Sequence, residues 1–290
     1  MSVHSDSLER LVSSLAGLLN PRQGPSRWPI ITATIGSGLV ASFATWCYHD
    51  YQAYLALGPG GPPYNVKGWA WITFGIRPFA LSKSGATLVS DYPETGAHES
   101  TVRLPPRQGE RALLGGIAPH RQLSQKAPEH MRERIVTLFS NAAKQYPELL
   151  EIKKSLYERH HDALFVSPAL LQQQPEVKSD TAASSACCPE CATIARGEIG
   201  HMHPDLSVHV YLSPADARQV IEKRWAERHR LAVPRTAWVK NKYAIADTYL
   251  MIYGPRNEEE LDVLAVILAN GIRYMTGRQD IGRLEWRRAL

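Results

Sequence analysis

The chain has 290 residues, of which 44% are hydrophobic and 21% are charged, and its formal net charge is +5. This composition is ordinary for a globular protein and is enough for one large domain or two small ones. The basic residues do not form runs interleaved with aromatics, which argues against nucleic-acid binding. A glycine-rich phosphate loop after a predicted strand is missing, so nucleotide cofactors have no support either.

An uncharged apolar segment of 21 residues runs from Trp28 to Tyr48. As a helix it would be roughly 30 Å long, which is the thickness of the hydrocarbon core of a bilayer. Trp28, Trp46 and Tyr48 lie near its ends, where interfacial aromatics are common. We therefore expect a polar leader over residues 1–27 and a transmembrane anchor over residues 28–48. A buried helix and a cleaved signal peptide are the alternatives.

Three arginines, Arg10, Arg22 and Arg27, precede this segment, whereas only His49 and Asp50 follow it closely. The positive-inside tendency then favours a cytosolic N-terminus, with the main domain on the other side of the membrane. We therefore expect a single-pass protein of an endomembrane such as the endoplasmic reticulum, with the membrane as one of its partners.

Residues 49–290 are expected to form one α+β domain, in which helices pack on a mixed or antiparallel sheet. We interpret Trp69–Ile76 as a first strand, and apolar periodicity predicts a helix from Glu129 to about Gln145. Residues 172–192 are mostly polar and poor in aromatics, so we expect a mobile insertion there.

The last third of the chain carries the clearest element signals. Ser213 before Pro214 predicts the start of a helix. Its apolar stripe is expected to comprise Ala217, Val220, Ile221 and Trp225. Residues 249–253 are predicted to be a buried strand, and Asn257 with Glu260 predicts the cap of a final helix. The buried face of that helix is expected to comprise Leu261, Leu264, Leu268, Ile272 and Met275.

Four groups suited to chemistry lie in one short segment, GEIGHMHPDLSVHVYL, residues 197–212. They are the carboxylate of Glu198 and the imidazoles of His201, His203 and His209. Imidazole moves protons and binds metals near neutral pH, and converging titratable groups are typical of functional sites. The alternative interpretation is a set of polar residues on a solvated strand face.

The geometry of this segment depends on the length of a predicted hairpin turn. Pro204 and Asp205 are turn residues between two strand patterns. A two-residue turn would send His209 to the face opposite His201. A three-residue turn, Pro204 to Leu206, pairs His201 with His209, and all three imidazoles then share one face. We predict the second register.

The cysteines Cys187, Cys188 and Cys191 form the run CCPEC. Zinc bound by these thiols with His201 and His203 is disfavoured, because the two histidines are separated by fewer residues than the histidine pair of a usual zinc finger. A cluster of surface thiols, or a disulfide if the domain is luminal, is the expectation.

Four runs of sequence resemble known proteins. GEIGHMHPDLSVHVYL, DARQVIEKRWAERHRLA and YGPRNEEELDVLAVILANGIRYMTG resemble the luciferase domain of fungal bioluminescence enzymes and their non-luminous relatives. DYQAYLALGPGGPPYNVKGW, after the apolar segment, is similar to the matching stretch of those enzymes, whereas the middle of the chain resembles them little. The resemblance implies a membrane-associated oxygenase. Such an enzyme adds O2 to a 3-hydroxy-α-pyrone without flavin or nicotinamide, and the adduct then loses carbon dioxide.

The residues that match this family are Glu198, His201, His203, His209, Trp225, His229 and Arg256. A histidine base would deprotonate the enol, and Arg256 would stabilise the resulting oxyanion. Tyr211 and Trp225 would line the substrate pocket, with His229 nearby. Three of these residues have a structural alternative: Trp225 as a core residue, Arg256 paired with a glutamate of the next helical turn, and His229 at a helix end.

We expect no cofactor, because the resemblance implies neither flavin nor nicotinamide. The alternative is a divalent metal, iron or zinc, bound by His201, His203 and His209 with Glu198. The leading hypothesis is an oxygenase whose partners are a small aromatic or polyketide-type enol and O2, without nucleic acid. A non-oxidative lyase, cyclase or hydrolase using the same histidines is the second hypothesis, and a non-enzymatic module binding a ligand or metal is the third.

Overall fold

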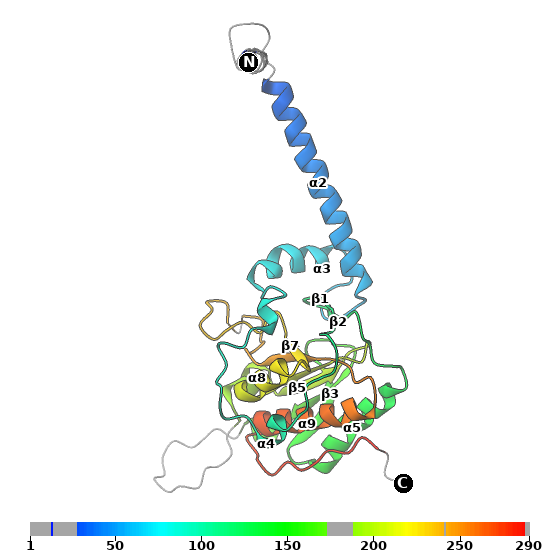
Figure 1. Cartoon of the computed structure of the whole chain (residues 1–290), viewed down its shortest axis with the longest axis vertical. Coiled ribbons are helices and arrows are strands. Elements are labelled where there is room, and N and C mark those ends of the chain that lie inside the picture. The colour runs from blue at the N-terminus through cyan, green and yellow to red at the C-terminus, as the bar shows by residue number, and fades with distance from the viewer. Residues whose placement is uncertain (1–12, 14–27, 173–187, 241, 288–290) are drawn as a thin grey trace, which may run out of the picture. The chain divides into compact units, whose positions relative to one another are not determined.

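The computed structural model describes Ser13 and residues 28–172, 188–240 and 242–287 (Figure 1). The expected leader lies outside the described residues apart from Ser13, and so does most of the expected insertion over residues 172–192. The chain divides into two units, Met1–Ala53 and Tyr54–Leu290. Both sheets and the candidate site belong to the second unit.

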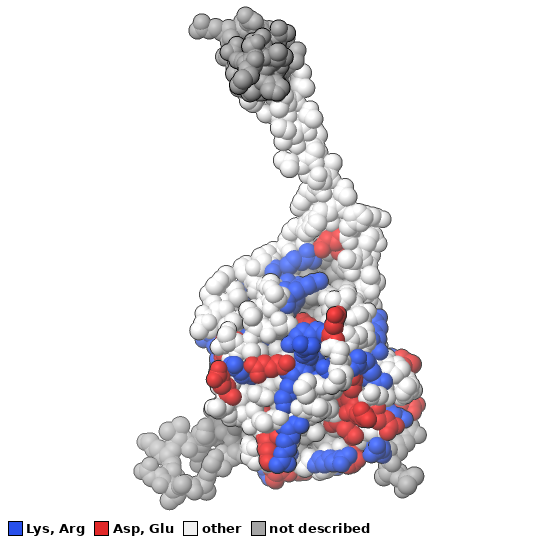
Figure 2. All heavy atoms as spheres, viewed as in Figure 1, with Lys and Arg blue, Asp and Glu red and all other residues white. Residues whose placement is uncertain are grey.

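The apolar N-terminal segment forms a helix, α2 (Trp28–Ala56), which continues past Tyr48. The helix is long and apolar enough to cross a membrane, and none of its most apolar 18-residue stretch is buried. Its hydroxyl side chains donate hydrogen bonds to carbonyls one turn earlier, as Thr34 does to Ile30. The helix carries no Lys, Arg, Asp or Glu before Asp50, whereas both kinds of charge are interspersed over the visible face of the second unit (Figure 2).

The second unit is built on a six-stranded antiparallel sheet in the order β3-β4-β5-β6-β8-β7. Its strands are β3 (Leu150–Lys154), β4 (Asp162–Val166), β5 (Glu198–Met202), β6 (Val208–Tyr211), β7 (Ala226–Arg228) and β8 (Tyr249–Ile252). A separate pair comprises β1 (Leu114–Gly116) and β2 (His120–Gln122). The predicted α+β class is confirmed.

Helices flank the sheet and connect its strands. The α-helices of the second unit are α3 (Val66–Ala70), α4 (Glu99–Val102), α5 (Met131–Gln145), α6 (Pro168–Leu171), α7 (Glu190–Ile194), α8 (Pro214–Glu222) and α9 (Glu258–Thr276). Both predicted caps are confirmed, because the side chains of Ser213 and Asn257 accept hydrogen bonds from the N–H groups of Asp216 and Glu260. The predicted apolar face of α9 is buried throughout.

The two faces of the central strands have different partners. Helix α9 packs on the aliphatic face so closely that a Cβ at Gly271 would lie 2.6 Å from a methyl group of Val210. Only glycine fits at this crossing. Residues directly opposite each other share a face, and so do residues two apart along one strand. His201 lies opposite His209, and Tyr249 lies opposite Tyr211, so these side chains lie together on the other side of the sheet. This second face carries the candidate site.

The predicted hairpin register is confirmed. His201 pairs with His209 across β5 and β6, and the N–H of His203 donates to the carbonyl of Ser207 over 2.8 Å. Leu206 closes the turn with a φ of 68°, and its own N–H donates to the carbonyl of His203 over 3.0 Å.

The prediction of a strand over Trp69–Ile76 is wrong. The segment is helical, with α3 followed by a π-helix, η1 (Trp71–Ile76), and by the 3-10 turns η2 (Arg77–Phe79) and η3 (Gly85–Thr87). The aromatic and β-branched residues suggested a strand. However, the side chain of Asn65 accepts hydrogen bonds from the N–H groups of Lys67 and Gly68, and this cap starts a helix.

The prediction that the helix after Ser213 continues through Trp225 is also wrong. Helix α8 ends at Glu222, and Arg224 adopts a left-handed φ of 65°. The following residues form β7 at the edge of the sheet, beside β8. Arg228 of β7 is buried and binds the carboxylate of Asp91 over 2.7 and 2.9 Å. This ion pair between distant segments forms where the chain is a strand instead of the predicted helix.

Candidate functional site

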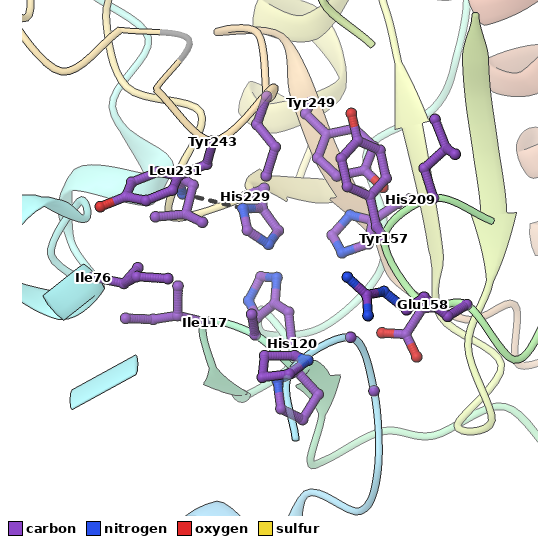
Figure 3. A pocket seen from close by; sticks show the side chains of 18 of the residues that line it. Ile76, Ile117, His120, Tyr157, Glu158, His209, His229, Leu231, Tyr243 and Tyr249 are labelled. Atoms are coloured by element: carbon purple, nitrogen blue, oxygen red, sulfur yellow. Dashed lines mark hydrogen bonds between the residues drawn. The ribbon is translucent and has the colours of Figure 1, made fainter. Parts of the chain in front are cut away.

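A cavity of about 340 Å³ lies against the histidine-bearing face of the sheet (Figure 3). Its walls come from β5, β6 and β8 and from segments near residues 60, 76, 118, 158, 229 and 243. The titratable residues that line it are His120, Tyr157, Glu158, Arg159, His201, His209, His229, Tyr243 and Tyr249. Aliphatic residues, glycines, prolines and Trp71 supply the remaining wall, so the cavity suits a small, largely apolar molecule with a few polar groups.

Glu198 and His201 form a buried pair at the wall of the cavity. Nδ1 of His201 lies 2.7 Å from Oε1 of Glu198. The same carboxylate accepts hydrogen bonds from the Ser155 hydroxyl over 2.8 Å and the Leu156 N–H over 2.7 Å. Because Glu198 accepts from all these partners, Nδ1 of His201 carries a hydrogen, and in the neutral ring Nε2 is then a bare lone pair.

His203 is held in the same way by the hairpin turn. Its Nδ1 lies 3.0 Å from the Ser207 hydroxyl, which donates its own hydrogen to Asp205. Nδ1 of His203 therefore donates, and its Nε2 is left bare. The two Nε2 atoms of His201 and His203 lie 3.2 Å apart. His203 is not part of the cavity lining, so it lies behind His201.

His209 presents a third bare nitrogen. Its Nδ1 lies 2.8 Å from the carbonyl oxygen of Leu250 and must donate to it. The ring stacks on Tyr249 with a centroid separation of 4.5 Å. Its centroid is 4.6 Å from that of His203 and 5.4 Å from that of His201. The three predicted imidazoles therefore converge.

Two further imidazoles complete the cluster, as Figure 3 shows. His229 was predicted; it follows β7, and its centroid is 5.0 Å from that of His209. Its Nδ1 accepts from the Leu231 N–H over 3.1 Å. His120, on β2, was not predicted, because its surrounding loop-rich sequence gave no sign that it reaches the hairpin. His120 is buried with no hydrogen-bond partner at Nδ1.

Burial is the main electrostatic influence on this cluster. Removal from water disfavours imidazolium and lowers the pKa of His120, His203 and His209 well below the usual value. The pKa of His229 falls to about 3 for the same reason. At neutral pH these rings are therefore uncharged, and the Nε2 lone pairs of His203 and His209 can accept a proton or bind a metal.

Glu158 brings a second carboxylate that the sequence did not reveal. Its two oxygens each accept a hydrogen bond over 2.9 Å from the guanidinium of Arg121, and both side chains are buried. Oε1 also lies 3.7 Å from Nε2 of His203. Two groups have the spacing of metal ligands within the described part of the chain: Glu158 with His201 and His203, and His120 with His209 and His229.

Tyr211 belongs to a buried stack behind the cavity. Its ring lies 4.4 Å from that of Tyr249, and its hydroxyl is 2.9 Å from that of Tyr157. The Tyr157 hydroxyl also donates to the carbonyl of Ala244 over 2.7 Å. Tyr157 and Tyr249 line the cavity, whereas Tyr211 supports them from behind.

Arg256 and Trp225 are not brought to the cavity. Arg256 binds Glu260 of the next helical turn, with Nε 2.8 Å from the carboxylate, which is the structural alternative given above. Trp225 is buried in the core, and its indole N–H donates to the carbonyl of Pro105 over 2.7 Å. Both residues have structural roles that account for their positions.

The cysteines lie apart from the imidazoles. Cys188 and Cys191 are not bonded to each other, so the disulfide alternative does not hold for this pair, and Cys187 lies outside the described residues. Cys191 is buried beside Thr248, and burial raises its pKa to about 12. Neither metal-ligand group found in the described residues contains a cysteine.

Comparison with known proteins gives a consistent result. The model of the luciferase domain family matches residues 196–271, which include the hairpin and most of α9. The luciferase of Armillaria ostoyae is 30% identical over 246 residues, covering 82% of this chain and 85% of that protein. The luciferase of Neonothopanus nambi is 28% identical over 233 residues, covering 78% and 80%. The similarity thus extends well beyond the C-terminal third. No solved structure matches the chain.

Proposed function

The chain belongs to the fungal luciferase family, and from this premise we propose that it is an oxygenase acting on a small aromatic or polyketide-type enol. The substrate class is that of 3-hydroxy-α-pyrones such as 3-hydroxyhispidin. O2 adds to the substrate without flavin or nicotinamide, and the peroxidic adduct loses carbon dioxide.

The observation that supports this proposal is the bare Nε2 of His209 at the wall of a cavity lined by aromatic rings. The cavity volume of about 340 Å³ lies within the range of small-molecule sites, about 300–1,000 Å³. Tyr157, which is half-buried at the cavity wall, provides a flat surface against which a planar ring can stack. The site thus combines a proton acceptor with a shape that suits a planar enol.

The chemical steps follow from this arrangement. Nε2 of His209 accepts the hydroxyl proton of the enol, and its Nδ1–H, held by the Leu250 carbonyl, keeps the ring in the required tautomer. The enolate carbon supplies the electrons for the new C–O bond, and O2 is reduced to the peroxide level. Of the lining residues that the structure describes, Arg159 is the one with a permanent positive charge, and it replaces Arg256 as the group expected to stabilise the oxyanion.

We also propose that α2 anchors the protein in a membrane as a single span. The support is the length of the helix, its apolar composition and the exposure of its side chains. A protease-protection assay on membrane vesicles tests this arrangement. Release of the intact protein by carbonate extraction contradicts it.

The test of the reaction is oxygen uptake by the full chain in detergent with 3-hydroxyhispidin, recorded together with carbon dioxide release and light. We expect His209→Ala to lower the rate by about 100- to 10,000-fold, the usual contribution of a general base. His160→Ala, a change of the same kind at an exposed histidine, is the matched control.

Product formed at an equal rate without oxygen contradicts the oxygenase and supports the non-oxidative alternative. Full activity of His209→Ala contradicts the assignment of the base.

A further inference from the structure

We propose that Glu158, His201 and His203 bind a divalent transition-metal ion. The ligand atoms of the three residues lie within 4.8 Å of one another, and all three side chains are buried. Two imidazoles and one carboxylate form a ligand set that binds iron(II) in non-haem oxygenases and also suits zinc. The inference goes beyond the proposed reaction, because it rests on ligand geometry alone.

The first argument is the direction of the lone pairs. The Nδ1 atoms of His201 and His203 both donate, to Glu198 and to Ser207, so in the neutral rings both Nε2 atoms are lone pairs. These two atoms face each other over 3.2 Å. Two lone pairs at this distance repel unless they share a proton or a metal ion.

The distance itself fits a shared metal ion. Zinc–nitrogen bonds are about 2.0–2.1 Å long, so two imidazole nitrogens are about 3.3–3.4 Å apart at a tetrahedral angle and about 2.9 Å apart at a right angle. The observed 3.2 Å lies between these values. The rings are therefore already placed as ligands of one ion.

The carboxylate completes the set from a different part of the chain. Oε1 of Glu158 lies 3.7 Å from Nε2 of His203, and Arg121 fixes the orientation of the carboxylate by binding both its oxygens. Metal-binding carboxylates and imidazoles are usually held by such outer hydrogen bonds. Here every proposed ligand has one.

The proposed ion would be accessible to a substrate. His201 and Glu158 line the cavity, whereas His203 lies behind them. An ion bound by these three side chains would keep its remaining coordination positions on the cavity side. The Glu198–His201 pair is then an orienting contact rather than a ligand contact, which differs from the metal set considered from the sequence.

The test is metal content and cobalt binding of the purified full chain. Elemental analysis by mass spectrometry should find about one iron or zinc ion per chain, and stripped protein should bind one Co²⁺ with a visible absorption band. We expect His203→Ala and Glu158→Gln to lower Co²⁺ affinity by about 10-fold or more, as the loss of supporting groups alone already does. His120→Ala, also a buried imidazole of the cavity, is the matched control and should bind normally.

Several outcomes overturn the proposal. The proposal is wrong if the protein binds no Co²⁺, in which case the two rings share a proton. It is also wrong if Co²⁺ binding survives in both ligand variants. Loss of binding in His120→Ala alone assigns the ion to the other imidazole group and also contradicts it. If neither ligand variant folds, X-ray absorption of the Co²⁺-loaded wild-type chain decides. Two imidazoles with a carboxylate oxygen support the site, and three imidazoles refute it.

Discussion

The residues of the two cavity walls come from the chain in different ways: one wall from a single segment, the other from distant segments. One wall is the hairpin of β5 and β6, where Glu198, His201 and His209 come from a single short segment. The other wall collects His120 and Glu158 from segments that are far apart along the chain. Both walls are buried and both carry imidazole or carboxylate groups. The difference shows that local periodicity places side chains relative to one another, whereas only the topology of the whole sheet brings the second wall to the first.

The largest expected effect concerns the second wall. Arg121→Met leaves the buried carboxylate of Glu158 without its partner, which should lower the free energy of unfolding by about 3–5 kcal/mol. Denaturant unfolding measures the change. The double variant with Glu158→Gln removes the uncompensated charge and should recover most of the loss. Equal instability of the single and double variants would show that the ion pair does not hold this wall.

An intermediate effect is expected in the hairpin wall. Glu198→Gln replaces an acceptor-only group by an amide, whose NH2 must face either His201 or the Leu156 N–H, so the contact that fixes the His201 tautomer is weakened. We expect kcat to fall by about 10- to 100-fold, as for other groups that orient functional histidines. Circular dichroism should show an intact fold. Ser207→Ala, which removes the corresponding contact of His203, should act in the same direction; an unchanged kcat in both variants would refute the orienting role.

A smaller effect is expected for a residue outside both walls. Trp225→Phe removes the hydrogen bond to the Pro105 carbonyl and keeps most of the packing. It should lower the free energy of unfolding by about 1 kcal/mol and leave oxygen uptake close to the wild-type rate. A large rise in KM with unchanged stability would instead place Trp225 in substrate binding.

The smallest effect is expected at the buried thiol. With its pKa raised to about 12, Cys191 stays protonated at pH 8 and should react with iodoacetamide far more slowly in the folded chain than in the urea-unfolded chain. Peptide mass spectrometry after timed labelling measures both rates. Rapid labelling of Cys191 in the folded protein would show that its surroundings open to solvent.

Much of the fold could be predicted because its signals are local. The strand alternation around His209, the turn residues after His203 and the cap residues Ser213 and Asn257 each act within a few positions. The register of the hairpin followed from turn length, since side chains alternate with a period of two. These signals also fixed the relative positions of the three hairpin imidazoles.

The rest could not be predicted because distant contacts decided it. The pattern after Ser213 remained helical up to Trp225, but β7 pairs with β8 instead. His120 stands in a proline-rich stretch whose two strands are each three residues long, so no periodic signal marked it. Glu158 follows a charged segment and resembles a solvated residue until Arg121 is placed beside it.

The turn residue Leu206 has a consequence for the evolution of the family. Its left-handed backbone is uncommon for a branched side chain, and the side chain is buried. The backbone conformation of Leu206 and the burial of its side chain thus both fix the length of the turn at three residues. A gain or loss of a single codon between His203 and Ser207 would turn His209 to the other side of the sheet in one step. Insertions should therefore be rarer in this turn than in the surface connections, and a descendant that carries one should also have lost selection on its histidines.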